Sequence, residues 1–215
     1  MGGDWLNPAL PGGLLEDGSA SNVPQDAEMR WRETISHIHA RYNGTVAWAL
    51  SYPDGVKNPP PFLDAVDQIY ILWSAPLASQ MDSPVDDMKF QADYILIHEI
   101  LPFHKRIGKP IILAISYPSI DAGAIGCITI LGGGCLDYDM LIPPNPYFPE
   151  LELNLDVQAD AYDAVLSAIN DNKWISGFVS KDYYPPAILQ DKSSSIHGKP
   201  SSRVLWYWSK NFLGR

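Results

Sequence analysis

The feature that most constrains this chain is the alternation of short apolar segments with helical patterns. Apolar runs at 45–50, 67–72, 110–116 and 174–179 have the length of β-strands. Strands of this kind, separated by helices, are typical of a parallel sheet whose strands are joined by right-handed crossovers. The sequence therefore predicts an α/β fold.

The helical patterns lie on either side of these runs. We expect helices at 24–42, 62–66, 84–107, 157–170 and 202–213, with Asp156 as the cap of the fourth. In the third, Phe90, Tyr94, Ile97 and Leu101 recur at helical spacing, and Gly108 follows as a stop signal. The expected order is αβ(α)βαβαβα.

Loop lengths point to the place of a functional site. The loops after the expected strands are long, whereas those after the helices are as short as Asn43-Gly44. In (β/α) barrels the active site is built from the loops at the C-terminal ends of the strands, and doubly wound sheets bind ligands at the same edge. We expect one domain over 1–215, with an N-terminal loop at 1–24 and a long loop at 122–155.

Charge and composition exclude several classes of function. The formal net charge is −10 and no segment carries a basic stripe, which argues against nucleic acid and anionic membrane surfaces as partners. The apolar runs are too short to span a bilayer, and the first 13 residues lack the basic and apolar regions of a signal peptide. No dinucleotide, P-loop or G-x-S-x-G motif occurs, so we expect no cofactor and no serine hydrolase.

The two cysteines, Cys127 and Cys135, flank a Gly-rich turn. Their spacing fits no common zinc pattern and no His lies nearby, so we expect no metal site. The alternatives are two free thiols or a small disulfide-closed loop. A polar loop would expose free thiols, which favours the disulfide and an extracellular or cell-surface location.

The C-terminal half resembles the last two units of TIM-barrel glycoside hydrolases of the clan A type, including mannanase-like families. A helix with Gln158, Ala159, Asp160, Tyr162 and Ala164 leads to a strand with Trp174, Gly177 and Phe178. A long loop then ends in Gly198-Lys199-Pro200, and the last helix carries Val204, Leu205 and Trp208. The stretch KPIILAISYPS resembles the seventh strand of the same barrels.

The resemblance implies a (β/α)8 TIM-barrel-like fold of which this chain supplies only the second half, about four βα units. With 174–179 as the eighth strand, 45–50 becomes the fifth. Half a barrel exposes two sheet edges and an apolar face. We therefore expect a second chain or a second copy of this one to complete it, unless the sequence is a fragment.

The resemblance also implies two catalytic carboxylates, held about 5 Å apart for retention or about 6.5–9.5 Å apart for inversion. The nucleophilic Glu of retaining members, in a context like T-E-x-G-Y-P-S, falls on Ala114 in this sequence. The candidate acids are therefore Asp4, after the missing fourth strand, and Asp121 and Asp182, after the seventh and eighth. Each could equally be a turn or loop residue.

Aromatic side chains at the strand ends suit stacking on a sugar, although rim packing would explain them as well. The candidates for substrate binding are Trp5, Tyr52, Trp73, Tyr117 and Tyr183. Two functions remain open: a glycoside hydrolase-like protein that acts on or binds polysaccharide, and a non-catalytic carbohydrate-binding or structural module with a degenerate barrel. Whether the chain is an enzyme is undecided at this point, because the expected nucleophile is absent.

Overall fold

The computed structural model describes residues 19, 22–128, 135–136, 138–141, 151–188 and 190–213. The chain divides into two compact units, which are described separately. The first takes residues 1–73, 98–114 and 174–178, and the second takes 74–97, 115–173 and 179–215.

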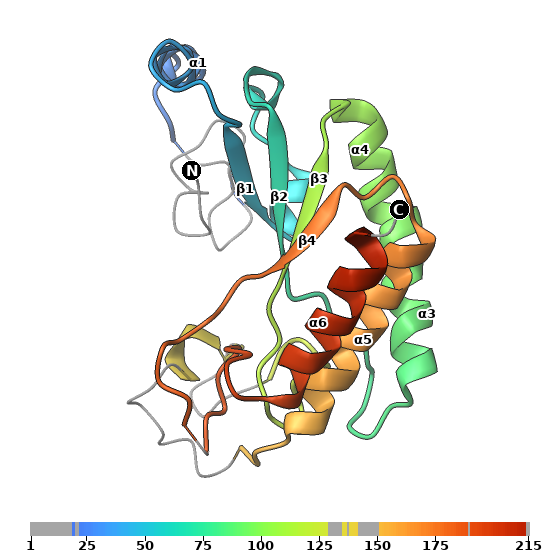
Figure 1. Ribbon diagram of the computed structural model, residues 1–215. Helices are drawn as coiled ribbons and strands as arrows, with labels where there is room; N and C mark the ends of the chain where they lie inside the picture. Colours follow the sequence, from blue (N-terminus) through green and yellow to red (C-terminus); the bar gives the residue numbers. More distant parts are fainter. Residues whose placement is uncertain are drawn as a thin grey trace. The chain divides into compact units, whose positions relative to one another are not determined.

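Four strands form one sheet in the order β1-β2-β3-β4, so that each strand neighbours the next along the chain (Figure 1). They are β1 (Ala47–Ser51), β2 (Gln68–Trp73), β3 (Ile111–Ile115) and β4 (Gly177–Ser180). β1 runs parallel to β2 with Ala47 opposite Gln68. The expected parallel sheet of four strands is confirmed, although β4 begins three residues later than the apolar run.

β1 and β2 bury alternate side chains, as a pleated sheet with one packed face requires. Trp48 on β1 is fully buried and packs edge-on against Trp31 of helix α1 (Ala27–His39) and against Phe62. The opposite positions are half-buried: Ala47, Ala49, Ser51, Gln68, Tyr70, Leu72 and Ile112. One face of the sheet is therefore a packed core and the other is partly open.

The expected helix at 84–107 is present in three pieces. α3 (Val85–Ile95) continues through a π-helical turn (Leu96–Ile100) into α4 (Leu101–Ile107), and Gly108 ends it in the left-handed region at φ 66°. The connection from β1 to β2 holds a four-residue helix that the sequence analysis missed, α2 (Asp54–Lys57), and a 3₁₀ turn (Leu63–Ala65).

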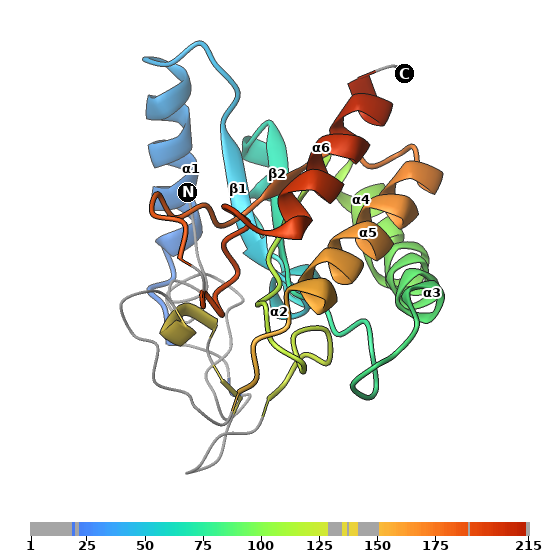
Figure 2. The same cartoon turned by 60° about the horizontal axis from the view of Figure 1, so that its bottom comes forward.

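In the second unit α5 (Leu155–Asp171) lies between α3 and α6 (Pro200–Leu213), as Figures 1 and 2 both show. α5 buries small side chains such as Ala161, Ala164 and Ala168, and α3 buries Ala92. Small residues let neighbouring helices approach closely. α3 also buries Met88 and Ile95, whereas the stripe seen in the sequence is exposed: Phe90 is 71% exposed, and Tyr94 and Ile97 (the latter in the π-helical turn) are exposed as well.

The N-cap of α5 is Asn154 rather than the expected Asp156. Its Oδ1 accepts hydrogen bonds from the backbone N–H groups of Asp156 at 3.0 Å and Val157 at 3.2 Å. Asp156 instead lies in the first turn, where its charge complements the helix dipole.

Candidate active site

The segment after β3 is held in place by polar contacts of its own residues. The hydroxyl of Tyr117, which is buried, donates to the Ala75 carbonyl at 2.7 Å. Ile120 forms an isolated antiparallel bridge with Leu153, and Asn154 N donates to Ser119 O at 3.0 Å. The loop that a (β/α) barrel would use for catalysis is thus tied to the start of α5.

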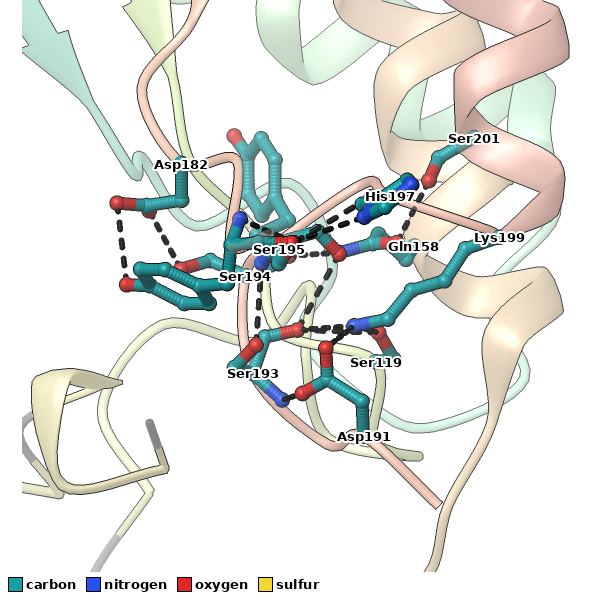
Figure 3. A network of polar contacts seen from close by, with 12 residues as sticks. Ser119, Gln158, Asp182, Asp191, Ser193, Ser194, Ser195, His197, Lys199 and Ser201 are labelled. Carbon is teal, nitrogen blue, oxygen red and sulfur yellow. Dashed lines mark hydrogen bonds and ion pairs between the residues drawn. The ribbon is translucent and has the colours of Figure 1, made fainter. Parts of the chain in front are cut away.

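Asp182, two residues beyond β4, lies in a buried cluster of hydroxyl groups (Figure 3). Its Oδ2 accepts from Ser116 Oγ at 2.9 Å and from Ser194 Oγ at 2.5 Å, and its Oδ1 accepts from Tyr184 at 3.4 Å. Only 7% of the residue is exposed. The carboxylate joins the ends of β3 and β4 to the loop that follows β4.

A buried ion pair holds the far end of that loop. Lys199 Nζ lies 3.3 Å from Asp191 Oδ2 and donates to Ser119 Oγ and to the Ser193 carbonyl, both at 2.7 Å. Burial lowers the pKa of Lys199 from its usual 10.5 to about 8, while Asp191 acts in the opposite direction. The pair connects the loop after β4 to the loop after β3.

Gln158 completes this network from α5. Its Nε2 donates to Tyr117 O at 2.7 Å, and its Oε1 accepts from Ser201 Oγ at 2.6 Å. From the sequence, Gln158 and Lys199 were predicted only as members of the motifs of the resemblance. A polar residue on the apolar stripe of a helix was the available signal that Gln158 is buried and hydrogen-bonded.

The pairing of Ser119 with Lys199 has the residue types of a serine–lysine nucleophile, but its geometry argues against that chemistry. Ser119 has no exposed surface, and its own hydroxyl donates to Ser193 O at 3.1 Å. A substrate carbonyl has no path to this oxygen in the structure. We therefore assign the contact to loop anchoring.

Asp121 lies in a different environment from Asp182. Its Oδ1 accepts from Asn154 Nδ2 at 2.8 Å, so the carboxylate orients the amide that caps α5. It also lines a cavity of about 310 Å³ that holds four carboxylates, those of Asp82, Asp121, Asp156 and Asp160. Burial, together with the charges of Asp156 and Asp163, raises the pKa of Asp160. Within the part of the chain that the structure describes, Asp121 and Asp182 share no hydrogen-bonding partner.

The aromatic candidates fall in three settings. Trp73 and Tyr117 are almost completely buried, which is evidence against a stacking role for either ring. Tyr52 is partly buried, stacks on Trp73 at 5.4 Å between ring centroids and donates to Glu99 at 3.0 Å, and burial raises its pKa. Tyr183 is 62% exposed and stacks on His197 at 4.5 Å. Its role stays a prediction.

Asp4 and Trp5 lie outside the described residues. Cys127 and Cys135 form a disulfide, as favoured from the sequence. Among the described residues no group of three or more His, Cys, Asp or Glu is arranged to hold a metal ion. No helix in the same part of the chain has the length and apolarity to cross a membrane.

Parallel strands separated by helices, with long loops at the strand ends, define half of a (β/α) barrel of the glycoside hydrolase type. The chain belongs to glycoside hydrolase family 113, whose family model matches residues 19–198. The resemblance to clan A, mannanase-like barrels is confirmed. None of the curated proteins that were compared matches the chain.

The fold is similar to that of several solved structures. A family 113 β-1,4-mannanase, solved as a complex, is 23% identical with a TM-score of 0.56. A family 113 β-mannanase from Alicyclobacillus acidocaldarius, in complex with ManMIm, is 25% identical with a TM-score of 0.53. The match covers 85% of this chain in both cases, and 51% and 50% of the mannanase chains. The chain thus spans about half the length of these relatives.

A more distant structure shares the fold alone. A Bifidobacterium dentium β-glucuronidase in complex with coumarin-3-O-glucuronide is 16% identical with a TM-score of 0.51, over 86% of this chain and 27% of that one. The family match, and not this distant structure, establishes that the chain is glycoside hydrolase-like and related to carbohydrate.

Proposed function

We propose that this chain recognises a β-1,4-linked mannan through the loops that follow its strands, and that its half of the barrel contributes binding without a nucleophile. The observation that carries the proposal is Ala114. By the resemblance of its strand to the seventh strand of clan A barrels, it falls where the nucleophilic Glu is expected, and it is 2% exposed. A methyl group can neither attack an anomeric carbon nor exchange a proton.

The neighbouring polar groups support the same conclusion. The hydroxyl group of Ser116, the first polar residue after β3, donates a hydrogen bond to Asp182. Asp182 accepts three hydroxyl hydrogen bonds in a buried setting, so using it as a nucleophile would require breaking a satisfied network. These contacts fit a loop-anchoring role for Asp182 rather than that of the second catalytic acid.

A hydrolase that uses Asp121 is the second candidate, and the acidic cavity favours it. Asp160, which lines that cavity with Asp121, has a raised pKa because of burial and the nearby Asp156 and Asp163. A raised pKa favours the protonated form of Asp160. Glycosidic cleavage uses two carboxyl groups, one that protonates the leaving oxygen and another that attacks or activates water.

Binding and hydrolysis measured on the same samples distinguish these candidates. Affinity electrophoresis in β-1,4-mannan and reducing-sugar release from a panel of mannans and glucans are followed for the whole chain. We expect retarded migration without sugar release. Release that Asp121→Asn abolishes, and that Asp87→Asn on the exposed first turn of α3 does not, would establish the second candidate. A chain that shows no retarded migration and releases no sugar would refute both candidate functions.

We also propose that a further (β/α)4 segment covers the partly open face of the sheet, from a second chain or a second copy. The half-buried residues of that face on β1 and β2 support this. Light scattering at increasing concentration tests self-association, and a monomer throughout would exclude the second copy. Because the disulfide needs an oxidising compartment, we further propose an extracellular or cell-surface location.

A further inference from the structure

Tyr183 presents a flat aromatic surface on the loop that begins just after β4. Its ring is 62% exposed and lies on the imidazole of His197, with 4.5 Å between ring centroids and 25° between the planes. One face of the Tyr183 ring is thus covered. This loop lies at the C-terminal end of its strand, where folds of this kind bind ligands.

The His197 ring that supports Tyr183 is itself held in a defined orientation. Its Nδ1 lies 2.9 Å from the Tyr184 carbonyl, and a carbonyl only accepts, so Nδ1 carries the proton. The buried Ser195 Oγ accepts from the backbone N–H groups of Tyr184 at 3.0 Å and His197 at 3.3 Å. One hydroxyl therefore ties together the backbone next to Tyr183 and the backbone of His197; Figure 3 shows Ser195 beside His197.

The residues on either side of these two rings anchor them further. Asp182, the neighbour of Tyr183, is bonded to Ser116 and Ser194, and Lys199, two residues after His197, is paired with Asp191. A ring on such a loop loses little conformational entropy when it binds a ligand, because it is ordered beforehand.

We propose that Tyr183 and His197 form a stacking platform for one pyranose ring of a β-1,4-linked polysaccharide, with Tyr183 in contact with the sugar and His197 as its positioning residue. This rests on the proposed function. A β-linked mannose or glucose ring places the axial C–H groups of C1, C3 and C5 on one face. These weakly positive hydrogens complement the negative face of an aromatic ring.

The platform has a specific consequence for selectivity. Mannose and glucose differ at C2, and the axial hydroxyl of β-mannose lies on the ring face opposite to the C1, C3 and C5 hydrogens. A ring that contacts only that apolar face does not distinguish the two sugars. The platform should therefore contribute equally to the binding of mannan and glucan chains.

Calorimetric titration of the whole chain with mannohexaose and with cellohexaose tests the platform. We expect Tyr183→Ala to weaken binding about tenfold for each hexasaccharide that the wild type binds, and Tyr183→Phe to stay within about twofold. Tyr42→Ala, at a tyrosine that is 55% exposed on the first unit, is the matched control and should have no effect. His197→Ala should weaken binding several-fold, and His197→Phe should restore most of it because an aromatic support remains.

The outcomes separate this inference from the proposed function. A wild type that binds neither hexasaccharide refutes the proposed function. A wild type that binds, with Tyr183→Ala equal to Tyr42→Ala, overturns the platform and leaves the proposed function intact. Loss in Tyr183→Phe as large as in Tyr183→Ala also overturns it, since the hydroxyl rather than the ring face would then carry the contact. Thermal unfolding of each variant shows whether it remains folded.

Discussion

The ammonium group of Lys199 lies 3.3 Å from the carboxylate of Asp191, and both side chains are almost completely buried. Removing one partner of a buried pair leaves the other charge without compensation. We expect Lys199→Met or Asp191→Asn to lower the free energy of unfolding by about 3 kcal/mol. Urea titration measures the loss.

The double variant provides the control for this pair. With both charges absent, neither desolvation cost remains, so the double variant should be within about 1 kcal/mol of the wild type. Additive losses in the two single variants, with no recovery in the double variant, would show that the two charges do not act as a pair.

The same lysine makes stability depend on pH above neutrality. Its pKa in the folded chain, about 8, lies below the ordinary 10.5. Between these values the unfolded chain holds a proton that the folded chain has lost, so this residue favours folding as the pH rises. Between pH 8 and 10, the free energy of unfolding of the wild type should rise relative to that of Lys199→Met by up to about 1.4 kcal/mol per pH unit.

Urea titrations of both proteins at pH 7, 8, 9 and 10 follow this difference. Using the variant as the reference removes the contribution of the tyrosines, whose ionisation also begins in this range. A constant difference across the series would show that the Lys199 pKa is not lowered.

Asp182 should matter for stability more than Asp121 does. Asp182→Asn replaces a carboxylate that accepts three hydroxyl hydrogen bonds, whereas Asp121→Asn affects a single bond from Asn154. Hydrogen bonds to charged groups contribute about 1.5–3 kcal/mol each in favourable cases. We expect a loss of about 2–3 kcal/mol for Asp182→Asn and about 1 kcal/mol for Asp121→Asn. Equal melting temperatures would contradict this ranking.

The disulfide should stabilise the loop after β3. Cys127 and Cys135 are eight residues apart, and closing a loop of this size constrains the unfolded chain by about 2–3 kcal/mol. Replacing both cysteines by serine should lower the free energy of unfolding by this amount. Dithiothreitol should lower the stability of the wild type and leave that of the serine variant unchanged. If the reductant leaves the wild type unchanged as well, the bond contributes nothing.

The regular elements were predictable because their signals are local. Alternating burial on β1 and β2, and the stop at Gly108, follow from periodicity and backbone chemistry over a few residues. The buried side of α3 was not predictable in the same way. Phe90 continues an apolar stripe, yet it is exposed, and the helix buries Met88, Ala92 and Ile95 on the face that packs in the fold.

The positions of candidate residues along the chain were predictable from the sequence, whereas their contacts were not. Asp182 and Tyr183 were found because they follow a strand. The partners that determine the role of Asp182 could not be found in this way, because Ser116 is 66 residues away in the sequence. Lys199 and Ser119 are 80 residues apart and meet at 2.7 Å. No spacing in a single sequence identifies such contacts.

The sequence by itself determined the parallel sheet and the half-barrel order of elements, because each depends on residue identity and short-range periodicity. Only the tertiary structure decided which polar side chains are buried together and which rings remain exposed. Burial depends on packing between distant segments, and the same aspartate or tyrosine is a ligand-binding group in an open cleft and a structural one in a closed core.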